Sequence, residues 1–289
     1  MDTITKITPA VLPLALVNDD GETAVLTLAL THPPTQVDVR AGLGLGASGA
    51  RAQMAYAAAE AWYVETGITT SARVVVELAT PNQLGLLADA TLSVAVRSVL
   101  ATVHGQAETG DGLDAAGQLA WTAYTKGGVF TQRVGGGVMR QATIEKPDSE
   151  AWVLIGHYPR FDPDLPATYE AELTAHLLAA DAPAGADDVA VWAALERDDF
   201  GGFAAAVGAL HRATAAQLSL PVLTAEQQMA LAAFESQGAV VWGRALSGQL
   251  TWGLVAGQQA AYDLRRRVRQ AVGHYGGTVF ATVPFVARR

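Results

Sequence analysis

Residues 72–105, ARVVVELATPNQLGLLADATLSVAVRSVLATVHG, decide the fold of this chain. The β-branched run 74–76 predicts a strand, Pro81 and Gly85 predict a turn, and residues 86–103 predict a helix. Apolar residues recur on more than one face of that helix, so we expect it to be buried. A strand, a tight turn and a buried helix direct the first amides of the helix at whatever lies above the turn, which is how many folds hold a phosphate.

The composition excludes several classes of protein. The chain has 289 residues, is 50% hydrophobic, carries a net charge of −9 and has no cysteine. It is long enough for one large or two medium domains, and its acidity argues against a nucleic-acid partner. The lack of cysteine excludes disulfides and is compatible with the cytoplasmic location that we expect. No apolar run reaches the roughly 18–20 residues of a membrane span, so no membrane partner is expected.

The first half of the chain mixes strands and helices. We expect strands at 11–17 and 24–30 joined by the turn 18–21, a third strand at 37–39, a helix at 50–66 stopped by Gly67, and a hairpin over 129–144. The apolar start is interpreted as a strand rather than an export signal, because no small-x-small cleavage site follows it. Gly42–Gly46 is interpreted as a flexible entry to the next helix rather than a dinucleotide loop.

The second half follows a polar stretch, 145–150, which we interpret as a domain boundary. It predicts strands at 152–158, 239–245, 252–256 and 278–286, helices at 167–180, 187–197, 200–217 and 258–272, and a further helix that a Thr224–Gln227 capping box begins. Because strands and helices do not alternate strictly, the sequence predicts an α+β protein of two domains, 1–148 and 149–289.

Several strings resemble the GHMP kinase superfamily, and beta-ribofuranosylaminobenzene 5'-phosphate synthase most closely. The Gly/Ser-rich phosphate loop of that family matches residues 81–91, its helix–GG–strand segment resembles 115–130, and its late Q-S-S-W-G motif is similar to residues 249–253. The resemblance covers almost the whole chain. It implies a two-domain GHMP kinase-like fold with a ribosomal S5 domain 2-like N-terminal half and a ferredoxin-like α+β C-terminal half.

The phosphate loop departs from the family pattern. Leu86 and Leu87 bring bulk where the family has small residues, and Asp89 brings a carboxylate to the start of the helix. A carboxylate can accept the same amides that a phosphate would use, so we interpret Asp89 as an N-terminal cap in preference to a ligand or metal contact. The hypothesis is that the protein fills the phosphate site with its own side chain and binds ATP or phosphoribosyl pyrophosphate weakly or not at all through this loop.

The candidate site residues fall into two groups. The catalytic candidates are Lys126, Asp111 and Asp114, the two aspartates as ligands of a Mg²⁺ ion. The substrate- or phosphate-binding candidates are Gly85, Asp89, Gly127, Gly128, Gly248, Gln249, Thr251, Trp252 and Gly253. Several of them have a structural alternative. Lys126 could be a solvated lysine, and Asp111 and Asp114 could serve only the solubility of their loop. Trp252 could be a core residue instead of a ring that stacks on a ligand. The acid that many GHMP kinases place before the GG pair is missing near Gln118. The six histidines show no metal-binding spacing, and no nucleophile elbow is present.

The resemblance implies a transferase of one-carbon metabolism. It would join a phosphoribosyl group to a hydroxy- or aminobenzoate in tetrahydromethanopterin-type cofactor biosynthesis, releasing pyrophosphate and carbon dioxide. An alternative is a diverged, non-catalytic GHMP-fold binding or assembly subunit, and a third is a small-molecule GHMP kinase. The expected partner is a small-molecule substrate, either phosphoribosyl pyrophosphate or an ATP-like compound, and a homodimer and a paralogous partner are both left open.

Overall fold

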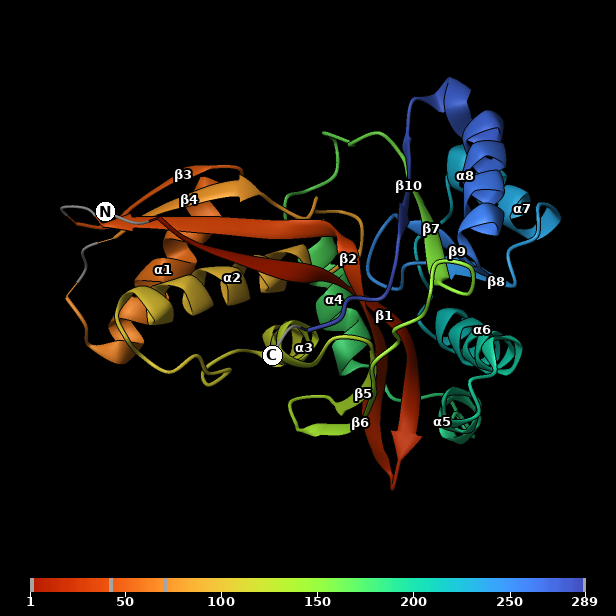
Figure 1. Cartoon of the computed structure of the whole chain (residues 1–289), viewed down its shortest axis with the longest axis horizontal. Helices are drawn as coiled ribbons and strands as arrows, with labels where there is room; N and C mark the ends of the chain where they lie inside the picture. Colours follow the sequence, from red (N-terminus) through yellow and green to blue (C-terminus); the bar gives the residue numbers. More distant parts are fainter. Residues whose placement is uncertain (1–2, 42–43, 70–71, 288–289) are drawn as a thin grey trace.

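The structure is a computed structural model that describes residues 3–41, 44–69 and 72–287, arranged as two sheets with helices packed against them (Figure 1). Within those residues the first sheet has six strands, in the order β3-β4-β2-β5-β6 with β1 also paired to β2. Their bounds are β1 (Ile4–Asp19), β2 (Glu22–Ala41), β3 (Gly46–Gly49), β4 (Ala72–Leu78), β5 (Val129–Arg133) and β6 (Val138–Ala142). The β3–β4 pair is parallel and the others are antiparallel.

The second sheet is antiparallel throughout. Its order is β10-β7-β9-β8, with β7 (Trp152–Tyr158), β8 (Val241–Arg244), β9 (Thr251–Ala256) and β10 (Thr278–Thr282). The helices are α1 (Ala52–Thr66), α2 (Ala88–Val103), α3 (Ala115–Lys126), α4 (Tyr169–Ala179), α5 (Val189–Glu196), α6 (Phe200–Gln217), α7 (Ala225–Ser236) and α8 (Gln258–Val272). The predicted α+β class is confirmed.

The two sheets divide between β6 and β7, where the sequence predicts the domain boundary, yet the halves share a core. Leu12 and Leu26 from the first sheet belong to the same buried cluster as Leu254 from the second and Phe203 from α6. Thr214 on α6 also accepts a hydrogen bond from a backbone amide of β1, at 3.0 Å. Two independent folding units with the limits 1–148 and 149–289 therefore stay a prediction.

The long hairpin β1–β2 extends beyond the two strands expected. Residues 37–39, which the sequence analysis predicted as a separate third strand, are the end of β2, and the hairpin turn is held by a bond from the Gly21 amide to the Asn18 side chain at 3.1 Å. Residues 8–17 are buried, because helices cover one face of β1 and the second half covers the other. Burial on both faces explains the continuous apolar run, which lacks the alternation of a half-exposed strand.

The glycine run before α1 has more structure than predicted. Gly46, the last residue of this run, begins β3, which pairs with β4, whereas Gly44 and Leu45 lie outside any strand. Residues 42–43, which belong to the same prediction, lie outside the described residues. Gly67 ends α1 in a left-handed conformation, as expected.

α2 is the helix around which the first half packs. It lies against α1, α3, β1 and β2 and buries ten of its side chains, which confirms the prediction of a buried helix. In Figure 1, α1, α2 and α3 cover one face of the first sheet, and α7 and α8 cover the outer face of the second. In the part of the chain that the structure describes, no helix is both long and apolar enough to cross a membrane.

Candidate functional site

The turn between β4 and α2 directs two backbone amides toward one point. Gly85 has a φ of +80° and Leu87 a φ of +52°, so both residues adopt the left-handed conformation. A leucine rarely takes this conformation, which glycine accepts readily. The turn therefore keeps the backbone shape of a glycine-rich loop, although its residues are larger.

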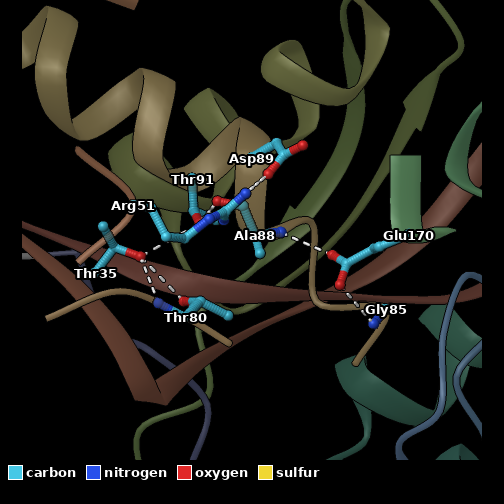
Figure 2. A network of polar contacts seen from close by, with 8 residues as sticks. All are labelled: Thr35, Arg51, Thr80, Gly85, Ala88, Asp89, Thr91 and Glu170. Carbon is cyan, nitrogen blue, oxygen red and sulfur yellow. Dashed lines mark hydrogen bonds and ion pairs between the residues drawn. The ribbon is translucent and has the colours of Figure 1, made fainter. Parts of the chain in front are cut away.

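A carboxylate from the second half of the chain fills that point. Glu170, in the first turn of α4, accepts a hydrogen bond from the Ala88 amide at 2.8 Å and from the Gly85 amide at 3.1 Å (Figure 2). Its side chain is buried, which raises its pKa, while the two amides and the charge of Arg51 oppose that rise. The amides at the start of α2 are thus satisfied by a carboxylate of the protein itself.

The interpretation of Asp89 as the cap is wrong. Its side chain makes no capping bond and instead forms an ion pair with Arg51 (Figure 2). A carboxylate of the protein does accept amides of this loop, but it is that of Glu170, and weak binding of phosphate compounds by the loop stays a prediction. One signal could have identified this glutamate: Glu170, Thr174 and Leu177 have helical spacing and form the buried face of α4, so a carboxylate lies on the face that is turned inward.

Threonines hold the loop from below. The Thr35 hydroxyl lies 3.1 Å from the Thr80 hydroxyl and 3.4 Å from that of Thr91, and it accepts the Thr80 amide at 3.0 Å. All three side chains are buried. This cluster connects β2, the loop and α2, so the position of the amides is determined before any ligand arrives.

The loop between β8 and β9 packs on the other side of residues 83–85. The Gln249 amide donates to the Gln83 carbonyl at 2.7 Å, and the Leu250 amide donates to the Leu84 carbonyl at 3.1 Å. Gly248 lies directly against Gly85. The structure therefore brings Gly85, Gly248 and Gln249 together, as the site prediction requires, through backbone contacts that join the two halves.

Gly248→Ala is expected to destabilise the protein by about 1–3 kcal/mol or more, as overpacking does. A Cβ at this position would overlap the backbone of Leu84 and Gly85, and backbone cannot turn aside as a flexible side chain can. Gly137→Ala is the matched control, because a Cβ there meets nothing within 4 Å. Urea unfolding of both variants tests this, and equal stabilities would contradict the tight packing of the two loops.

The predicted residues of β9 lie in the core. Trp252 is fully buried and packs edge-to-face on His211, with ring centroids 5.1 Å apart. The Thr251 hydroxyl lies 3.2 Å from Nδ1 of His157, and Gly253 packs on Phe234. Of the two interpretations of Trp252, the structure supports the core residue and not the ring that stacks on a ligand.

Acid is expected to weaken the fold through His211. This side chain is buried, its Nδ1 lies 2.7 Å from the Leu14 carbonyl, and burial lowers its pKa from 6.5 to about 4. The unfolded chain therefore takes up this proton first, so stability is full above pH 6.5 and declines as the pH falls toward 4. The loss amounts to about 3 kcal/mol. Urea unfolding of the wild type and of His211→Gln at pH 7.0 and 4.5 measures it, and parallel declines would exclude His211 as the cause.

The remaining predicted residues lie around α3. Lys126 is exposed at the end of the helix, and Gly127 and Gly128 pack against residues 285–287 and 142–143. Asp114 caps the helix by accepting the Gly117 amide at 2.7 Å. Among the residues that the structure describes, no group of three or more histidine, aspartate or glutamate side chains is placed to hold a metal. Mg²⁺ on Asp111 and Asp114 thus stays a prediction.

A pocket of about 690 Å³ opens beside the filled loop, between α1, α2, the start of α3 and α4. Of the predicted residues it contains Asp89 and Asp114, whereas Lys126 and the glycine and β9 candidates do not line it. Its charged lining residues are Glu65, Asp89, Arg97, Asp114 and Glu170, and most of the others are alanine, leucine, glycine, methionine or valine. The structure therefore has a mostly apolar pocket next to the loop, of a size that small molecules can occupy.

Comparisons with known proteins identify the fold. Protein-family models and curated proteins gave no match. Among solved structures, Lactococcus lactis galactokinase complexed with galactose is similar with a TM-score of 0.71 and 13% identity over 99% of this chain and 94% of that one. A putative sugar kinase from Campylobacter jejuni has a TM-score of 0.69 and 15% identity over 99% and 97%. Streptococcus pneumoniae phosphomevalonate kinase has a TM-score of 0.65 and 13% identity over 99% and 100%.

These neighbours define a class by its fold. The chain has the two-domain α+β fold of the GHMP kinases over nearly its full length, as the resemblance in the sequence implies. Homoserine and mevalonate kinases are similar structures as well, so the neighbours are small-molecule enzymes. None of them is a ribofuranosylaminobenzene phosphate synthase.

Proposed function

We propose that this protein binds a small organic molecule in the pocket beside α2 and does not hold a phosphate on the loop that its fold provides for one. The observation that carries the proposal is the pair of hydrogen bonds from the Gly85 and Ala88 amides to Glu170. This corresponds to the diverged binding subunit among the functions that the sequence suggests. A fold does not by itself carry an activity, so the site decides.

Competition for the amides is the physical reason. A phosphate would have to displace Glu170 from two hydrogen bonds to a charged group, each contributing about 1.5–3 kcal/mol. The displaced carboxylate would then lie close to the phosphate and to Asp89, and like charges repel in a partly buried site. Binding of a nucleotide or of phosphoribosyl pyrophosphate through this loop is therefore weak.

A small-molecule kinase is the second candidate, and one observation favours it. Arg51 is largely buried beside the loop, and its Nη1 atom has no hydrogen-bond partner in the part of the chain that the structure describes. If Glu170 turned away, this guanidinium would be the nearest cation for a phosphate. The likeness of the whole chain to kinases agrees with this candidate. Phosphate binding by the loop would, however, require the Glu170 side chain on α4 to leave the two amides.

The phosphoribosyl-transferring synthase rests on the sequence resemblance alone. It too needs the loop amides, since pyrophosphate charge must be stabilised as it develops. The titration described below therefore tests both enzyme candidates, the kinase and the synthase. A homodimer or a paralogous partner would suit the binding subunit and is proposed only on that resemblance.

Calorimetric titration with ATP and with phosphoribosyl pyrophosphate, each with and without Mg²⁺, tests the proposal. We expect no binding below millimolar concentration, no phosphoryl transfer, and no pyrophosphate release with hydroxy- or aminobenzoate. Micromolar binding of either compound that Asp89→Arg abolishes would overturn the proposal. Asp263→Arg makes the same charge change on α8, away from the pocket, and is the control.

A further inference from the structure

The pocket beside α2 has small apolar walls. α4 contributes Ala171, Ala175 and Leu178 on one side, and α1 contributes Met54 and Ala58 on another. Walls of this kind leave room for a flat or compact apolar body and offer it dispersion contacts over most of its surface. The volume of about 690 Å³ is that of a site for a molecule of drug size.

The charges of the pocket are mostly negative. Four carboxylates line it, those of Glu65, Asp89, Asp114 and Glu170. Two cations oppose them: Arg97, which pairs with Glu65, and Arg51 beside the pocket, which pairs with Asp89. One oxygen of Asp114 accepts the Gly117 amide, and the other has no hydrogen-bond partner among the residues that the structure describes. A cation entering the pocket would find acceptors, and an anion would meet repulsion.

Arg97 is not free to receive an anion. Its Nη1 donates to Glu65 at 3.1 Å, and its Nη2 donates to the same carboxylate and, at 2.7 Å, to the Asp111 carbonyl. The bidentate pair uses both terminal nitrogens, and such pairs are geometrically specific. A carboxylate or phosphate ligand would therefore have to break this pair to gain a cationic partner.

Thr174 supplies an independent sign of a ligand. It is 7% exposed, lines the pocket, and its hydroxyl makes no hydrogen bond to any residue that the structure describes. Its oxygen is not closed off from the cavity, so a polar atom of a ligand can bond to it there.

We propose that the ligand of this pocket is a small organic cation, with an apolar ring-sized body and one protonated amine. The body lies against the alanine-rich walls of α1 and α4, the amine donates to the free oxygen of Asp114, and a polar atom of the ligand meets Thr174. This inference rests on the proposed binding function and names the class of molecule that the pocket takes.

Two probes of equal shape and opposite charge test it. Tryptamine and indole-3-propionate share an indole and a two-carbon arm, and they end in an ammonium and a carboxylate. Calorimetry at pH 7 is expected to show tryptamine binding at least tenfold more tightly. Equal or tighter binding of indole-3-propionate would overturn the inference, and so would the absence of binding by either probe at millimolar concentration.

Variants place the probe. Asp114→Asn keeps a good helix cap and removes the negative charge, so it is expected to lower the affinity for tryptamine at least fivefold. Ala175→Trp fills the pocket from an exposed position on α4 and is expected to abolish binding, whereas Asp263→Asn on α8 leaves it unchanged. Unaltered binding in Ala175→Trp would overturn the inference. The two proposals are overturned by different results. Binding of ATP or phosphoribosyl pyrophosphate at the loop would overturn the proposed function, whereas the two indole probes test only the class of ligand in the pocket.

Discussion

Trp252→Ala is expected to lower the free energy of unfolding by about 3–5 kcal/mol, the range for removing a large aromatic side chain from a core. Trp252 is fully buried in the cluster that both halves share, so the cavity would open where the two sheets and α6 meet. Its Nε1 has no hydrogen-bond partner among the described residues. The loss is therefore one of packing, and no polar bond contributes to it.

Two further variants separate packing from function. Trp252→Phe keeps an aromatic ring and is expected to lose less than half as much stability, because the Nε1 that it removes is unpaired. Tyr262→Ala changes a side chain that is 64% exposed and should stay within about 0.5 kcal/mol. Guanidinium unfolding measures all three. Near-wild-type stability of Trp252→Ala together with lost ligand binding would restore the interpretation of Trp252 as a ring that stacks on a ligand.

Glu170→Ala is expected to cost about 2–4 kcal/mol, because it leaves two buried amides without an acceptor. The Gly85 and Ala88 amides both donate to this carboxylate, so its removal takes the acceptor from both. Burial raises the pKa of Glu170, so its contribution is largest in acid and declines as the pH rises through that raised pKa. The difference in stability between wild type and variant should therefore be larger at pH 4 than at pH 8.

The same variant tests whether the loop can still hold an anion. Inorganic phosphate is expected to raise the melting temperature of Glu170→Ala and not that of the wild type, because only the variant has free amides. Glu172→Ala removes an exposed carboxylate from the same helix and should change neither quantity measurably. A phosphate response in the wild type of equal size would show that Glu170 does not block the loop.

Local features of this protein were predictable from its sequence. The Thr224–Gln227 capping box forms as expected, because its hydrogen bonds join residues three apart. The strand, turn and buried helix of residues 72–105 also form as predicted, since the β-branched run, the turn residues and the apolar helix faces all lie within one continuous segment.

The identity of the buried anion could not be predicted in this way. Asp89 is adjacent to the loop in the sequence, yet Glu170 bonds to the amides because α4 crosses the loop there. The burial of Trp252 likewise depends on how α6 and the first sheet pack on β9. Such contacts join residues far apart in the chain, and no periodicity within one segment encodes them.

The sequence by itself thus determined the α+β class, the buried helix and the expectation that a carboxylate of the protein would replace a phosphate, because composition, spacing and turn chemistry act over a few residues. Only the tertiary structure decided which carboxylate does so, that a pocket with an excess of carboxylates lies beside it, and that Arg97 is already paired. Those facts depend on the placement of α4 against α1, α2 and α3, which is determined by the packing of the whole chain.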